Sequence, residues 1–110
     1  MVDLRVMPYY LDDEGVRWVE DTIASMTDEE KIGQLFVNMG ASRTEEYLTD
    51  VVERYKFGAV RYNPGTAAQV HEQNRILQEN ARIPLLIASN AEAGGNGACT
   101  DGTYVGYPIK

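Results

Sequence analysis

Three polar side chains near the end of the chain are of types that could do chemistry: Asn90, Glu92 and Asp101. Paired carboxylates can divide between them the work of an acid, a base or a nucleophile. Glu92 and Asp101 stand in a glycine-rich stretch, where carboxylates are most often solvated, so we do not expect a catalytic pair. Asn90 and Glu92 are either ordinary turn residues or contacts to a ligand, because asparagine commonly ends a strand and also donates and accepts hydrogen bonds.

Other reactive residue types lack the partners that their chemistry requires. His71 has no second histidine or cysteine at ligand spacing, so we expect no metal site. Cys99 has no identifiable base beside it and is expected to be inert. Residues 95–100 begin like a GxGxxG phosphate loop, but Thr100 takes the place of the third glycine, which argues against a dinucleotide. We therefore expect no cofactor, and we assign no catalytic residue in this chain.

Composition limits the partners that the protein can have. The chain has 110 residues, with 44% hydrophobic residues and a formal net charge of −7. This acidic balance and the scattered basic residues argue against nucleic acid and against an anionic membrane surface. A single cysteine excludes an intrachain disulfide and suits a reducing compartment, and the first residues lack the apolar core of a secretory signal. We expect a cytoplasmic protein without a membrane span.

Periodicity and capping signals place the elements that must position these side chains. A leading helix is indicated by apolar residues at helical spacing: Val16, Val19, Ile23 and Met26. Capping boxes at residues 27–30, 42–45 and 66–69 open three further helical segments. Apolar runs predict a buried strand within 32–37 and further strands at 59–62 and 83–88. Residues 93–110 are glycine-rich and are expected to be irregular.

Strands that alternate with amphipathic helices indicate an α/β fold with a parallel sheet. Three strands cannot close a barrel, which needs about 250 residues. We therefore expect part of a (β/α)8 TIM-type barrel: about the first three β/α units with a leading helix, so that residues 1–110 form one incomplete N-terminal segment. The alternative is a small flavodoxin-like α/β module that binds a ligand or a partner without catalysis. That module would need about five strands.

Three phrases of the sequence resemble one enzyme family in the right order. They are residues 26–36 (MTDEEKIGQLF), 57–63 (FGAVRYN) and 73–95, which ends in IPLLIASNAEAGG. These phrases resemble the opening of glycoside hydrolase family 3, and the resemblance spans roughly residues 20–97. It implies a barrel enzyme of carbohydrate metabolism, a glycosidase that cleaves β-linked sugars with retention through a covalent intermediate, without metal or cofactor.

The last phrase carries the finer implication. In the β-N-acetylhexosaminidase-like branch the third strand typically ends in an Asp, followed by one residue of any type and then by Glu-Gly-Gly. Glu92 and the glycines after it resemble this branch, which implies an N-acetylglucosaminide substrate with Asn90 and Glu92 as its contacts. Asn90, however, replaces the Asp that usually binds sugar, and Ala93 is inserted before the glycines.

The family's nucleophile and acid/base lie in regions that correspond to positions beyond Lys110. We therefore expect the 110 residues alone to be inactive and to be an interrupted piece of the parent enzyme. A three-strand sheet also leaves unpaired edges and uncovered apolar faces, so we expect the chain to self-associate through its exposed strand edges.

Overall fold

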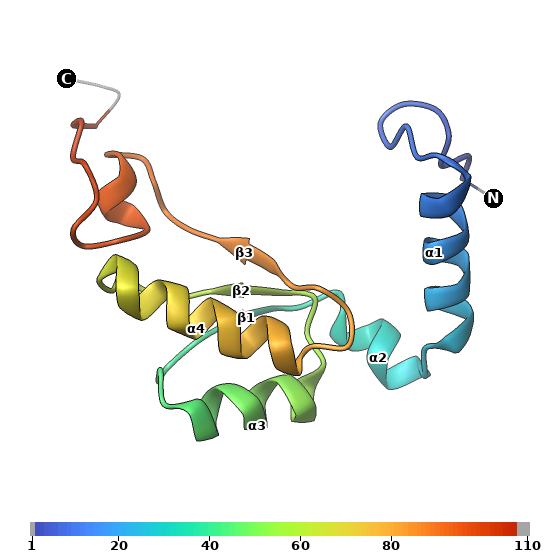
Figure 1. The fold of residues 1–110 in the computed structure, drawn as a ribbon, viewed down its shortest axis with the longest axis horizontal. Helices are drawn as coiled ribbons and strands as arrows, with labels where there is room; N and C mark the ends of the chain where they lie inside the picture. The colour runs from blue at the N-terminus through green and yellow to red at the C-terminus, as the bar shows by residue number, and fades with distance from the viewer. Residues whose placement is uncertain (1, 108–110) are drawn as a thin grey trace.

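The computed structural model describes residues 2–107, and three short parallel strands form its centre (Figure 1). They are β1 (Val37–Met39), β2 (Ala59–Arg61) and β3 (Leu86–Ala88), and they lie in the order β1-β2-β3. In the register, Asn38 pairs with Val60 and Val60 pairs with Ile87. The predicted α/β class with three parallel strands and intervening helices is confirmed.

Two helices cover one face of this sheet: α3 (Glu45–Tyr55) and α4 (Ala67–Asn80). In Figure 1 both lie on the same side of the strands, and they pack against each other. The hydrophobic core lies between them and the sheet, and it consists of Leu48, Val51, Val52, Phe57, Val60, Ile76, Leu77 and Leu85.

The strand order decides against a flavodoxin-like module. In a flavodoxin-like fold the strand order 2-1-3-4-5 places the first strand between the second and the third. Here the strands follow chain order and both crossover helices lie on one face, which is the arrangement of a sheet that winds into a barrel.

The opposite face of the sheet is uncovered among the residues that the structure describes. Because side chains alternate along a strand, Val37, Met39 and Leu86 face away from α3 and α4. They are 56%, 60% and 74% exposed. The prediction that the first strand is buried is therefore wrong. Its apolar side chains lack a second layer to pack against.

The first strand also begins later than predicted. The apolar run at 32–37 is divided between the end of α2 (Asp28–Gly33), a turn and the first residue of β1. The backbone amides of Leu35 and Phe36 donate to the carbonyls of Ile32 and Gly33, which closes that turn. Strand pairing starts only where β1 lies beside β2.

Side-chain caps fix the helix starts. The capping boxes Thr27–Glu30 and Thr66–Gln69 are both present, at α2 and α4. The box predicted at 42–45 is not formed, because Thr44 is the N-cap of α3 and accepts from the Tyr47 amide. Ser42 instead lies before the helix, with its hydroxyl accepting from the Thr44 amide.

The leading helix and the last segment lie outside the sheet layer. Helix α1 (Asp13–Ser25) stands at one end of the molecule, away from β3 (Figure 1). Its predicted apolar stripe buries Val16, whereas Ile23 is 53% exposed. The segment after β3 is irregular, as predicted, apart from the short 3-10 helix η1 (Gly95–Gly97). No helix within residues 2–107 has the length and apolar character that crossing a membrane requires.

Candidate sugar-binding edge of the sheet

The carboxyl ends of the three strands meet at one edge of the sheet because the strands are parallel. The loops that leave this edge begin at Gly40 after β1, at Tyr62 after β2 and at Ser89 after β3. In barrels of this type ligands bind at the carboxyl ends of the strands. Asn90 and Glu92 lie in the third of these loops, on the edge where the sequence predicts a ligand site.

The side chains of Asn90 and Glu92 are both exposed. The hydrogen bonds found within residues 2–107 do not include either side chain, so both remain available to a ligand. Ala93, the residue inserted relative to the resembled pattern, is 9% exposed. Its carbonyl accepts from the Val105 amide at 2.7 Å. The insertion is therefore an anchor of the loop, while the polar residues before it stay free.

The glycine-rich segment folds back onto the backbone of Asn90. A Cβ atom at Gly97 would lie 1.6 Å from the Asn90 carbonyl oxygen, so only glycine fits there. The loop thus fixes the main chain at Asn90 without engaging its side chain.

Asp101 has a structural role. Its Oδ1 atom accepts a hydrogen bond of 2.8 Å from the backbone amide of Ala67, the first residue of α4. A carboxylate at a helix N-terminus is favoured both by this bond and by the helix dipole. Next to it, the Thr100 amide donates to the Gly65 carbonyl at 2.7 Å. These contacts fasten the loop after β3 to the loop after β2.

Arg43 ties the loop after β1 to the loop after β2. Its guanidinium lies over the Tyr62 ring, 5.5 Å from the ring centre. Its Nε donates to Oε1 of Gln73 at 2.7 Å, and its Nη2 donates to the Asn63 carbonyl. Gln73 is only 3% exposed, so its carbonyl oxygen needs this partner. Together with Gly40, Ala41, Ser42 and Gln69, the residues Arg43, Tyr62 and Asn63 enclose a hollow of about 280 Å³.

The Tyr62 ring is part of this network and packs directly against Gly40. A Cβ atom at Gly40 would lie 1.7 Å from Cζ of the Tyr62 ring, so the ring occupies the space that glycine leaves. Burial raises the pKa of Tyr62 to about 12. Its hydroxyl is buried without a hydrogen-bond partner among the described residues. The sequence predictions missed this network, although Asn63 directly after a strand was a signal.

Arg61 lies on the uncovered face at the same edge. Its neighbour Val60 is 0% exposed and faces the helices, so alternation turns Arg61 the other way. Arg61 pairs in register with Met39 and Ala88, at the carboxyl ends of β1 and β3. Its Nη1 donates to Oδ1 of Asn63 at 3.1 Å.

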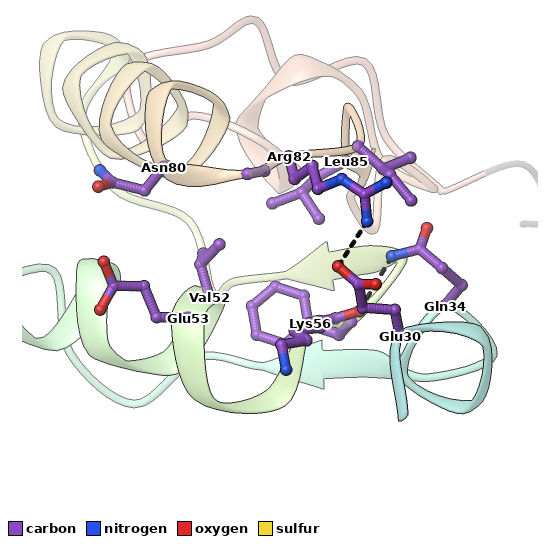
Figure 2. Close-up of a pocket in the computed structure, with 11 residues that line it drawn as sticks. Glu30, Gln34, Val52, Glu53, Lys56, Asn80, Arg82 and Leu85 are labelled. Atoms are coloured by element: carbon purple, nitrogen blue, oxygen red, sulfur yellow. Dashed lines mark hydrogen bonds and ion pairs between the residues drawn. The ribbon is translucent and has the colours of Figure 1, made fainter. Parts of the chain in front are cut away.

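The cavity in Figure 2 lies at the opposite, amino-terminal edge of the strands. It has a volume of about 250 Å³ and is lined by residues that precede the strands, among them Gln34, Phe57 and Leu85. In Figure 2 the side chains of Arg82 and Glu30 point toward one another, and they form an ion pair of 2.7 Å. In (β/α)8 barrels the active site lies at the other edge, formed by the carboxyl ends of the strands. We therefore assign this cavity no ligand.

Metal-binding residue types do not gather within residues 2–107: no three of His, Cys, Asp and Glu are placed to hold an ion. His71 is exposed on α4, and Cys99 is a half-buried free thiol. The isolated parallel bridge between Cys99 and Gly65 places the thiol residue in the contact between two loops.

Comparison with known proteins gives these loops a context. No protein-family model matches the chain. A β-N-acetylglucosaminidase/β-glucosidase of Cellulomonas fimi is 38% identical over 106 residues, which is 96% of this chain and 19% of that enzyme. The chain is homologous to a segment of this enzyme.

Solved structures extend the homology to the fold. A β-glucoside phosphorylase BglX bound to 2FGlc superposes with a TM-score of 0.81 at 41% identity, over 93% of this chain and 19% of that protein. A second structure of β-glucoside phosphorylase BglX gives a TM-score of 0.78 at 41% identity, over 93% of this chain and 18% of that protein. The resemblance to glycoside hydrolase family 3 is thereby confirmed as homology, and the three strands match part of a larger domain. The chain spans about a fifth of the length of these relatives.

Proposed function

We propose that this chain is part of an enzyme that acts on β-linked sugars, and that Asn90 and Glu92 contact the sugar. The observation that carries the proposal is homology over 93–96% of the chain to enzymes named for β-glucosides and β-N-acetylglucosaminides. The position of the two residues supports it, because they follow β3 at the ligand-binding edge of the sheet and their side chains are exposed.

The substrate that we favour is a β-N-acetylglucosaminide. Glu92 and the glycines after it support this choice through their resemblance to the hexosaminidase-like branch. A neutral amide at Asn90 offers one acceptor and two donors, whereas a carboxylate offers only acceptors. Asn90 therefore binds sugar hydroxyls more weakly than an aspartate would, because hydrogen bonds to an ionised group are about twice as strong.

The catalytic step itself belongs to residues outside these 110. Retaining glycosidases use two carboxyl groups about 5–5.5 Å apart. Asp101 accepts a hydrogen bond of 2.8 Å from the start of α4, which gives it a structural role, and we do not propose it as the partner of Glu92. In the proposed enzyme the chain supplies part of the sugar-binding wall, and the nucleophile and the acid/base come from other segments, with no cofactor.

Binding can be tested directly on the chain. We expect N-acetylglucosamine, and more weakly methyl β-glucoside, to shift the backbone NMR signals of Asn90 and Glu92. Asn90→Ala and Glu92→Gln should each reduce the affinity at least about threefold, because each removes hydrogen bonds to the sugar. Glu53→Gln, an exposed carboxylate at the opposite edge, is the matched control and should change nothing. Sugar-induced shifts that avoid the loop after β3 would contradict the proposed contacts.

Hydrolysis of a chromogenic substrate gives a second test. The chain alone should not release nitrophenol from 4-nitrophenyl β-N-acetylglucosaminide, in water or in phosphate buffer. Turnover that persists in the wild-type chain and disappears in Glu92→Gln would place a catalytic group among these residues and overturn that part of the proposal.

A further inference from the structure

Among the residues that the structure describes, Arg61 has no carboxylate counter-ion, although the chain is acidic. The formal net charge is −7, and Asp and Glu number 17. Arg5, Arg54, Arg75 and Arg82 each form an ion pair with one of these carboxylates. Within residues 2–107 no carboxylate lies at ion-pair distance from Arg61. The one side-chain hydrogen bond that it forms with the described residues goes to Asn63, whose amide oxygen is neutral.

The guanidinium of Arg61 is nevertheless held in place. Asn63 Oδ1 accepts from Nη1 at 3.1 Å, and the Asn63 carbonyl accepts in turn from Arg43. Arg43 is itself fixed by the Tyr62 ring and by Gln73, which is almost fully buried. A neutral acceptor orients a guanidinium but does not neutralise it, so the remaining N–H groups of Arg61 stay free for an anion.

The position of Arg61 links it to the proposed sugar site. Arg61 pairs with Ala88 across the β2–β3 ladder, and Asn90 follows Ala88 by two residues. Both residues thus lie at the carboxyl-terminal edge, and Arg61 lies on the face that α3 and α4 leave uncovered. A planar fork of N–H donors suits two oxygens of one phosphate or carboxylate.

We infer that Arg61 binds an oxyanion beside the sugar, and that Arg43 is the residue that positions it by way of Asn63. This inference rests on the proposed function for the identity of the neighbouring sugar. The oxyanion is either inorganic phosphate or a carboxylate carried on the sugar, because both present the paired oxygens that a guanidinium recognises.

The experiment follows the Arg61 Nε–Hε NMR signal of the chain during titration with sodium phosphate, and separately with methyl β-glucuronide. Sodium chloride at equal ionic strength and methyl β-glucoside serve as the reference titrations. Saturable shifts with phosphate alone identify a free anion, and shifts with the glucuronide alone identify a carboxylate on the sugar. A response equal to that of chloride in both arms would overturn the inference.

Variants separate binding from positioning. Variants at position 61 lack the Arg61 signal, so their binding is followed at the backbone amides of Asn63 and Ala88. Arg61→Gln should lower the affinity for the oxyanion at least about tenfold, because hydrogen bonds between ionised groups are the strong ones. Arg17→Gln is the matched control, since Arg17 is exposed on α1 and also forms no ion pair within the described residues. Arg43→Met should weaken binding, while Arg43→Lys should restore part of it by keeping a donor for Gln73. An unchanged affinity in a folded Arg43→Met chain would refute the positioning role.

Failure of this inference can be told apart from failure of the proposed function. Sugar shifts at Asn90 and Glu92 without any oxyanion response refute only the role of Arg61. An oxyanion response at Arg61 without sugar shifts refutes the sugar contacts and leaves an anion site. Backbone spectra of each variant show whether it is folded. If Arg61→Gln fails to fold, Arg61→Lys replaces it, because a lysine keeps the charge but loses the fork and should still reduce affinity.

Discussion

The carboxylate of Asp101 binds the backbone amide of Ala67 at 2.8 Å and so joins the last loop of the chain to the start of α4. The two residues are far apart in the sequence, and the bond satisfies a helix amide that has no partner within its own helix. Thr66 and Gln69 satisfy two neighbouring amides in the same turn. The start of α4 is therefore held both by its own residues and by the loop that follows β3.

Replacing Asp101 by alanine should destabilise the fold by about 1 kcal/mol, the usual effect of losing a carboxylate cap at a helix N-terminus. Urea unfolding measures this change, and hydrogen exchange at the Ala67 amide should accelerate. Asp101→Asn keeps an oxygen acceptor and should cost less. Equal losses for the two variants would show that charge at the helix end, and not the bond, is what stabilises α4.

The ion pair between Glu30 and Arg82 makes the stability depend on pH. The hydrogen bond from Arg82, aided by the Thr27 amide, lowers the pKa of Glu30 below its ordinary value of 4.5. Above that value Glu30 is ionised in both the folded and the unfolded chain, so its stabilising contribution is fully present. The contribution is lost as the pH falls from 4.5 through the lowered pKa of the folded state.

We expect Glu30→Gln to remove part of this acid-induced loss of stability. Thermal unfolding between pH 6 and pH 2.5 measures it, and the difference between wild type and variant should shrink as the pH falls. Arg82→Gln should remove the same portion, and the double variant should add little more. If the stability difference between the wild type and Glu30→Gln instead grew toward low pH, the predicted pH dependence would be reversed and the assignment to Glu30 would be disproved.

Gly40 should not tolerate a side chain. Gly40→Ala would place a methyl group inside the Tyr62 ring, 1.7 Å from its Cζ atom. We expect a loss of about 1–3 kcal/mol from overpacking. Gly95→Ala is the control, because the nearest heavy atom to a new Cβ there is 3.4 Å away. The double variant Gly40→Ala/Tyr62→Ala should unfold little earlier than Tyr62→Ala alone if the two residues share one space.

We propose that the uncovered face of the sheet leads the chain to self-associate. Val37, Met39 and Leu86 present apolar surface beside two unpaired strand edges. Sedimentation velocity should show a dimer or a larger species at tens of micromolar. Met39→Lys and Leu86→Lys should shift the chain toward monomer, whereas Ala68→Lys, on the exposed side of α4, should not. A wild-type chain that sediments as a monomer would contradict the proposal.

Local signals in the sequence predicted the parts of the fold that depend on neighbouring residues. The caps Thr27–Glu30 and Thr66–Gln69 form as predicted because both partners lie within one turn. The capping box predicted from Ser42 was wrong, because the hydroxyl of Thr44 caps α3 at the position where the helix begins. The first strand was placed too early and was expected to be buried, because an apolar run does not reveal whether a second layer covers it.

The candidate site was predictable only in part. Asn90 and Glu92 could be placed after β3, because the apolar strand before them is easy to recognise and the phrase around them resembles a family pattern. Arg43, Gln73 and Asp101 could not be assigned in the same way. Their partners lie 20 to 34 positions away, and only the folded chain brings those positions together.

The one-sided core has a consequence for how this segment folds. Every core residue comes from positions 48–85, and each crossover joins a strand to the next strand along the chain. Contacts of such short sequence separation form quickly, since little loop entropy is lost in making them. We therefore expect α3, β2, α4 and β3 to form a nucleus before the rest of the sheet is ordered.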